Sequence, residues 1–133
     1  MIHQNLTDQI IKAFYTVYNE LGYGFLEKVY ENALFLELQS SGLTVMRQMP
    51  IDVFYHKTKV GTYYADLCVE NKVIIELKAA EGINKEHEHQ LLNYLKATCI
   101  EVGLLLNFGI KPELKRKIFE NRFKNPFSSV PSV

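Results

Sequence analysis

The sequence of 133 residues has no net charge, because its 15 Lys and Arg residues balance its 15 Asp and Glu residues. This zero balance gives no global electrostatic argument for a nucleic-acid partner. Tryptophan is absent, and the two cysteines, Cys68 and Cys99, form neither a CxxC pair nor a zinc-ligand pattern. No apolar run approaches the length of a membrane span, and no segment has the layout of a signal peptide. These absences favour a cytoplasmic protein with reduced thiols and no membrane partner.

Charge is nevertheless distributed unevenly along the chain. Residues 1–44 contain two basic and five acidic side chains, whereas residues 111–124 contain six basic and two acidic ones. A basic region that includes Lys115, Arg116 and Lys117 is suited to contact the phosphates of a nucleic acid. A solvated helix near the C-terminus explains the same charges equally well.

Length and composition are those of one globular domain with a substantial core. The chain is 47% hydrophobic and 23% charged, as in ordinary soluble proteins. Neither an internal repeat nor a linker divides it. We therefore expect a single domain over residues 1–124, followed by a short flexible tail over residues 125–133.

Hydrophobic periodicity predicts an α/β fold with the element order α-α-β-β-β-α-β-α. The last strand follows a helix, so it can return parallel to the third strand and give a mixed β-sheet flanked by helices. The expected helices cover residues 6–21, 26–40, 85–97 and 113–123. The expected strands cover residues 45–49 and 51–55 with a bend at Pro50, the stretch from residue 60 into the next hairpin, and residues 72–79 and 102–107.

Residues 63–80 are predicted to form the central β-hairpin, and this hairpin carries Asp66, Glu76 and Lys78. Strand side chains alternate between faces, so Glu76 and Lys78 share one face of the sheet. Asp66 joins that face only if the turn contains an odd number of residues. Asn71 can adopt the left-handed conformation that a three-residue loop with a bulge requires, so we expect the odd loop.

Two converging carboxylates beside a lysine suit hydrolysis that depends on a divalent metal. Oxygen ligands favour Mg²⁺ or Mn²⁺, which bind one or two carboxylates and complete their coordination with water and substrate phosphate. The metal lowers the pKa of a bound water, and the lysine adds positive charge at the water or at the scissile phosphate. The alternative is a simple ion pair on the surface of a strand, which a lone Glu-x-Lys motif more often forms.

Two further pairs of residues lie four apart on predicted helices and therefore share a face. Glu27 and Glu31 repel each other slightly and would benefit from a nearby cation, although solvated surface glutamates are the simpler explanation. Gln90 and Tyr94 are helical neighbours that can both form hydrogen bonds.

These motifs, in this order, resemble those of the PD-(D/E)XK nuclease superfamily. Asp66 lies on one central strand, and the next strand carries Glu76, Leu77 and Lys78. Residues 24–30, GFLEKVY, fit the GxxExxY signature that names a family of small bacterial proteins within that superfamily. The resemblance covers nearly the whole chain, and it implies a restriction-endonuclease-like core of three layers.

The resemblance also implies roles for the residues that match. Asp66 and Glu76 correspond to the metal-binding acids, and the backbone carbonyl of Leu77 to a further metal ligand. Lys78 corresponds to the catalytic lysine that positions or activates the attacking water. Glu27 corresponds to the acid from an early helix that completes or supports the metal shell.

Further matches have supporting roles in the resemblance. Gln90 corresponds to the glutamine that contacts the substrate phosphate or the nucleophile, and Tyr94 supports it, as in the Gln-x-x-x-Tyr motif of RecB-like members. Tyr30 and Glu31 belong to the signature around Glu27 and its continuation.

From this resemblance we expect a nuclease that requires Mg²⁺ or Mn²⁺ and hydrolyses phosphodiester bonds of nucleic acid, with DNA as the first substrate to test. The alternative is a catalytically silent module that binds nucleic acid or protein on the same fold. A hydrolase of a small phosphate compound is a third interpretation. A chain of this length leaves little room for a long nucleic-acid groove, so a homo-oligomer is also considered.

Overall fold

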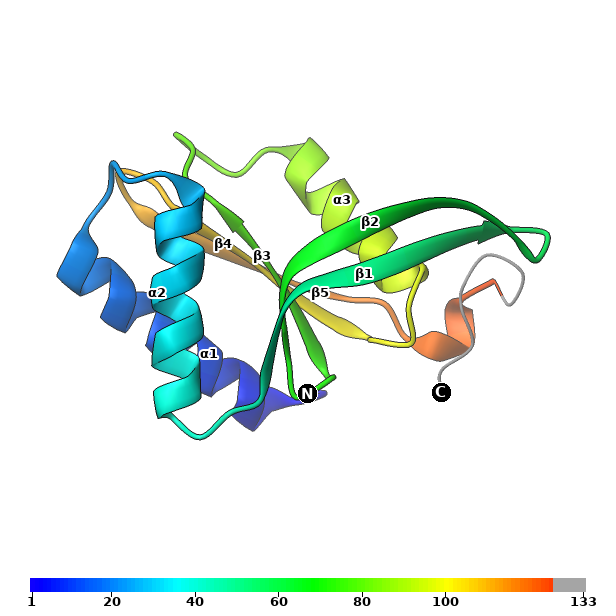
Figure 1. Cartoon of the computed structure of the whole chain (residues 1–133), viewed down its shortest axis with the longest axis horizontal. Coiled ribbons are helices and arrows are strands. Elements are labelled where there is room, and N and C mark those ends of the chain that lie inside the picture. Colours follow the sequence, from blue (N-terminus) through cyan, green and yellow to red (C-terminus); the bar gives the residue numbers. More distant parts are fainter. Residues whose placement is uncertain (126–133) are drawn as a thin grey trace.

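The computed structural model describes residues 1–125, and the predicted tail lies outside them except for its first residue. Its helices are α1 (Gln4–Leu21), α2 (Glu27–Ser40) and α3 (Lys85–Lys96), with a short 3-10 helix, η1 (Asn121–Phe123). Its strands are β1 (Val45–Tyr55), β2 (Thr58–Val69), β3 (Val73–Lys78), β4 (Val102–Phe108) and β5 (Pro112–Ile118). Figure 1 shows these elements along the chain.

The five strands form one mixed sheet in the order β1-β2-β3-β4-β5. Strands β3 and β4 run parallel, joined through α3, whereas the other neighbours run antiparallel. Helices α1 and α2 cover one face of the sheet, and α3 covers the other (Figure 1). The predicted α/β class, the mixed sheet and the parallel return of the fourth strand are therefore confirmed.

The predicted last helix, residues 113–123, is wrong, because most of it forms strand β5. Every residue of β4 is buried, so the backbone groups along its outer edge need hydrogen-bonding partners. β5 supplies them by pairing antiparallel along β4 from Pro112 to Ile118. The element order is accordingly α-α-β-β-β-α-β-β.

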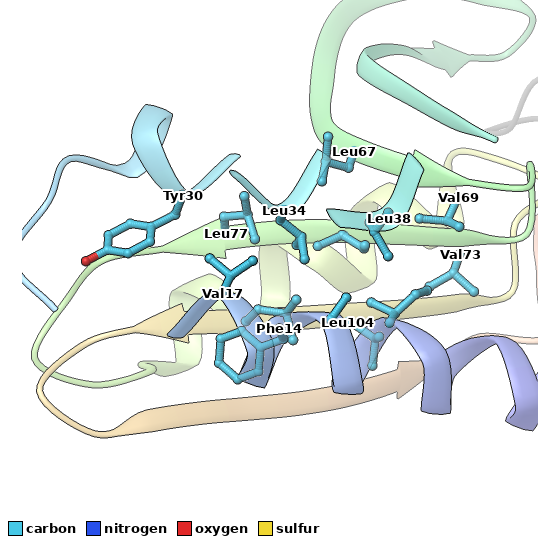
Figure 2. Close-up of a cluster of buried hydrophobic side chains, with 14 of the residues drawn as sticks. Phe14, Val17, Tyr30, Leu34, Leu38, Leu67, Val69, Val73, Leu77 and Leu104 are labelled. Atoms are coloured by element: carbon cyan, nitrogen blue, oxygen red, sulfur yellow. The ribbon is translucent and has the colours of Figure 1, made fainter. Parts of the chain in front are cut away.

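The two faces of the sheet have separate hydrophobic cores. The larger one lies under α1 and α2, where Phe14, Leu34 and Leu38 pack on strand residues such as Leu67 and Leu104 (Figure 2). The smaller one lies under α3 and is built from Leu91, Leu95 and their strand neighbours. Alternation along the strands distributes side chains between the two cores, so a polar residue on the α3 face of β3 approaches α3.

Local details refine the helix and strand boundaries. Helix α1 begins at Gln4, before residue 6 where the sequence predicted its start, and Thr7 is buried inside it. Asn84 is the N-cap of α3 and forms a reciprocal capping box with His87. Pro50 lies within β1, an edge strand in which a missing N–H group is tolerated. Within residues 1–125, no helix is both long and apolar enough to cross a bilayer.

Candidate active site

The turn between β2 and β3 has the odd length that the site requires. Val69 pairs with Val73, which leaves three residues between them. Glu70 and Asn71 both have φ of 55°, and the N–H of Lys72 donates to the carbonyl of Val69 at 2.9 Å. The left-handed conformation expected for Asn71 is therefore present.

The two acids lie where β2 and β3 separate. Regular pairing of these strands ends at Leu67 and Ile75. Beyond that point, Glu76 Oε2 accepts a hydrogen bond from the Asp66 backbone N–H at 2.8 Å. Asp66 Oδ2 accepts one from the Leu77 backbone N–H, also at 2.8 Å. The two carboxylates thus replace the missing ladder bonds, and we call Asp66, Glu76 and Leu77 the strand fork.

Burial and mutual repulsion make the fork a poor place for two negative charges. Glu76 is only 5% exposed, and burial, followed by the charge of Asp66, raises its pKa to about 8. Burial also raises the pKa of Asp66, and the carboxylates of Glu31 and Glu27 raise it further. The charge of Lys78 lowers the pKa of both acids, but less than burial and the neighbouring carboxylates raise it. A divalent cation at the fork would remove this penalty.

Lys78 ends β3, and the strand places it two residues beyond Glu76 on the same face. It pairs in register with Asn107 of β4, which is fully buried. The Asn107 amide donates to the carbonyl of Ala80 at 3.0 Å and accepts from the Ala80 N–H at 2.9 Å. These two hydrogen bonds fix the chain segment that follows Lys78. Sequence reasoning missed Asn107, although a polar residue near the end of an apolar strand is a usable signal.

Helix α2 contributes two glutamates that differ in environment. Glu27 is exposed at the first turn, close enough to raise the pKa values of Asp66 and Glu76. Glu31 is 4% exposed and accepts hydrogen bonds from Lys28 and Gln48, each at 3.0 Å. The interpretation of Glu31 as a solvated surface residue is therefore wrong.

Arg47 adds a second cation to Glu31, with its Nη2 at 3.6 Å from a carboxylate oxygen. Gln48, the other β1 partner of Glu31, has φ of 50° within the strand. The contacts tie α2 to β1 beside the fork. No sequence pattern singled out Arg47 or Gln48, because their partner lies on another element.

Tyr30 is fully buried and fixes the turn that leads into α2. Its hydroxyl donates to the carbonyl of Gly22 at 2.7 Å and accepts from the N–H of Phe25 at 3.2 Å. Its ring stacks on Phe108, with centroids 4.3 Å apart. Tyr30 therefore acts on the site by setting the start of α2, where Glu27 lies.

Gln90 and Tyr94 form the hydrogen-bonded pair that their spacing allows. Gln90 Nε2 donates to Tyr94 Oη at 2.7 Å, and Tyr94 is 5% exposed. Burial raises the pKa of Tyr94, and the charge of Glu76 raises it further. Tyr94 is therefore close enough to the fork for the charge of Glu76 to affect it.

The three basic residues Lys115, Arg116 and Lys117 lie on strand β5, so they do not share one face. Lys117 forms an ion pair of 2.6 Å with Glu88 of α3. Arg116 instead donates to the carbonyl of Ile2, beside α1. The structure therefore does not gather all three into a single basic surface.

The donor set fits a small hard cation that keeps much of its water. Across residues 1–125, no cluster of three or more His, Cys, Asp or Glu side chains is arranged as a metal cage. Asp66 and Glu76 are the two acids that meet, and each uses one oxygen for a backbone bond. Mg²⁺ and Mn²⁺ accept such a set, because water and substrate phosphate complete their coordination.

Comparison with known proteins identifies the superfamily of the chain. A family model described as the PD-(D/E)XK nuclease superfamily matches residues 4–118. The chain belongs to this superfamily. A comparison of this superfamily member with curated proteins gives no match. Its fold is similar to the crystal structure of SSO0001, with 12% identity and a TM-score of 0.48, over 70% of this chain and 50% of that chain. The chain thus spans half the length of that protein.

Proposed function

We propose that this protein is a nuclease that requires Mg²⁺ or Mn²⁺ and hydrolyses phosphodiester bonds, with DNA as the substrate. The observation that supports it most is the strand fork, where Asp66 and Glu76 interlock through backbone bonds of 2.8 Å while Lys78 follows on the same strand. Membership of a nuclease superfamily supports the same reaction class. The raised pKa values of both acids favour a bound cation at this point.

Each residue has a defined task in this proposal. Asp66 and Glu76 would hold the cation, together with the carbonyl of Leu77, and Glu27 would support them from α2. The cation would lower the pKa of a bound water and neutralise charge on the phosphoryl oxygens. Lys78 would orient the attacking water and stabilise negative charge on the scissile phosphate. Gln90, held by Tyr94, would contact the substrate phosphate.

We further propose that the chain belongs to the GxxExxY family within the superfamily. Gly24 has φ of 109°, a conformation that favours glycine, and Tyr30 clamps the same turn through Gly22 and Phe25. Glu27, between these two signature residues, opens α2. In this proposal, the signature residues position Glu27 beside the strand fork.

The test is a cleavage assay on circular single-stranded DNA, linear duplex DNA, supercoiled DNA and a matched RNA, with Mg²⁺, Mn²⁺ or EDTA. Wild type is compared with Lys78→Ala and with Lys72→Ala, an exposed lysine at the opposite end of the same hairpin. We expect cleavage that depends on metal, is lost in Lys78→Ala and is kept in Lys72→Ala. Equal cleavage by all three proteins would indicate a contaminating nuclease and count against the proposal.

The catalytically silent module makes a different prediction for the same proteins. Its binding of nucleic acid would weaken with salt and would survive Glu76→Ala and Lys78→Ala. Lack of cleavage by wild type together with such binding would replace the nuclease proposal. Analytical ultracentrifugation at the assay concentration would show whether a homo-oligomer is the active form.

A further inference from the structure

A cavity of about 600 Å³ lies beside the strand fork, between α3 and the β1–β2 ribbon. Its size is within the range of pockets that bind small ligands, about 300–1,000 Å³. One wall is a stripe of α3 that includes Gln90 and Asn93, and the opposite wall is Val53 and Tyr63 of the ribbon. Gln90 therefore belongs to both this cavity and the candidate active site.

The ribbon reaches this position because it is longer than the strand beside it. β1 and β2 pair from Val45 and Val69 out to Tyr55 and Thr58, whereas β2 pairs with β3 only through Leu67. The part of the β1–β2 ribbon that lies beyond β3 projects from the rest of the sheet, and we call it the arm (Figure 1). The cavity lies where the arm leaves the sheet, and it shares Tyr94 with the surroundings of the fork.

We propose that this cavity binds an unpaired nucleobase of the strand whose phosphate occupies the fork. Tyr63 is 52% exposed, and its ring lies 5.8 Å from that of the buried Tyr94, so the site offers an accessible aromatic face backed by a fixed one. Stacking on aromatic side chains is the usual way in which proteins hold single-stranded bases. The proposal rests on the proposed function, because the fork must hold the neighbouring phosphate.

The polar groups of the cavity fit a base better than a phosphate. Its charged lining residues are Glu86 and Lys96, whose charges cancel, and it also contains His89. A groove that follows the phosphate backbone would instead carry several Lys or Arg residues. The side-chain amide of Asn93 can both donate to and accept from the edge of a base. A base within a duplex uses its Watson–Crick edge for pairing, so a base that offers this edge to Asn93 must be unpaired.

The test measures binding rather than cleavage, by fluorescence anisotropy of a labelled 12-nucleotide single strand, with Ca²⁺ in place of Mg²⁺ or Mn²⁺ so that the carboxylates of the fork hold a cation for the phosphate. The variants are Tyr63→Ala, Tyr63→Phe and the control Tyr64→Ala, whose side chain is 56% exposed and does not line the cavity. We expect Tyr63→Ala to raise the Kd at least fivefold, equivalent to about 1 kcal/mol, with Tyr63→Phe and Tyr64→Ala within twofold of wild type. The same sequence as a blunt duplex should bind more weakly than the single strand.

Three results would overturn the proposal. The first is equal binding by Tyr63→Ala and Tyr64→Ala, and the second is a duplex that binds as tightly as the single strand. The third is a free mononucleotide that binds as tightly as the strand and depends on Tyr63, since the ligand would then be the mononucleotide itself. Cleavage by wild type alongside any of these results would leave the nuclease proposal standing. Binding that depends on Tyr63, without cleavage by wild type, would support the base-binding cavity and count against the nuclease proposal.

Discussion

Replacing Glu76 with glutamine should stabilise the metal-free protein at high pH. The side chain is 5% exposed, and its pKa is raised from 4.5 to about 8. Between these two values the folded state binds more protons than the unfolded state, so the free energy of unfolding falls as pH rises. Glutamine keeps an oxygen that can accept from the Asp66 N–H but cannot ionise, so the variant should lack this pH dependence.

The size of the effect follows from the two pKa values. Each pKa unit is worth about 1.4 kcal/mol, so burying the ionised Glu76 lowers stability by about 5 kcal/mol above pH 9. At pH 5 the same side chain is mostly protonated in the folded protein, and the loss is below about 1 kcal/mol. The stability of Glu76→Gln relative to wild type should therefore increase by about 4 kcal/mol between pH 5 and pH 9.

The assay is urea unfolding in EDTA at pH 5, 7 and 9, followed by circular dichroism. Glu20→Gln serves as a control because Glu20 is exposed on α1, where loss of one charge changes stability little. The comparison uses differences between proteins, so titrating groups that do not interact with Glu76 cancel. A difference between Glu76→Gln and wild type that is the same at pH 5 and pH 9 would refute the account of a buried, repelled carboxylate.

Further predictions concern the metal and the structural supports of the site. Mg²⁺ at one hundred times its Kd should raise the unfolding free energy of wild type by about 2.7 kcal/mol at pH 8 and leave Glu76→Gln unchanged, as measured by thermal unfolding. Tyr30→Phe should lower stability by about 1–3 kcal/mol in urea, because the carbonyl of Gly22 loses its buried donor. Gly109→Ala should lower stability by about 1–3 kcal/mol, because the new Cβ would lie 2.3 Å from the carbonyl oxygen of Ala80. Cleavage by Gly109→Ala should fall by more than the loss of folded protein explains, since Ala80 lies just after β3, which carries Glu76 and Lys78.

The hairpin that carries Asp66, Glu76 and Lys78 was predictable from sequence because its determinants are local. Alternation assigned Glu76 and Lys78 to one face, and the turn chemistry of Asn71 fixed the parity that brings Asp66 opposite Glu76. These inferences need only residues close together in the chain. The backbone bonds that the two carboxylates accept were not predictable, because they arise where β2 and β3 separate, and no local pattern marks that point.

Strand β5 shows the opposite situation. Its sequence, PELKRKI, has a weak apolar pattern, and its charges suggested an exposed helix. What makes it a strand is the open edge of β4, whose seven residues are all buried and whose backbone needs partners. That demand comes from a distant element, so local propensity was overridden by tertiary pairing. Alternation along β5 accordingly places Arg116 on the opposite face from Lys115 and Lys117.

The strand fork links the stability of the sheet and the proposed catalysis through the same two side chains. Asp66 and Glu76 each use one oxygen to hold the diverging strands, and each keeps another oxygen for a cation. Binding a metal therefore does not require the backbone bonds to open. It follows that amide replacements, which keep one oxygen, should preserve the fork while removing the charge that attracts the cation. Alanine replacements, which keep neither oxygen, should lose both. The comparison of Asp66→Asn with Asp66→Ala thus separates the structural task of this residue from its chemical one.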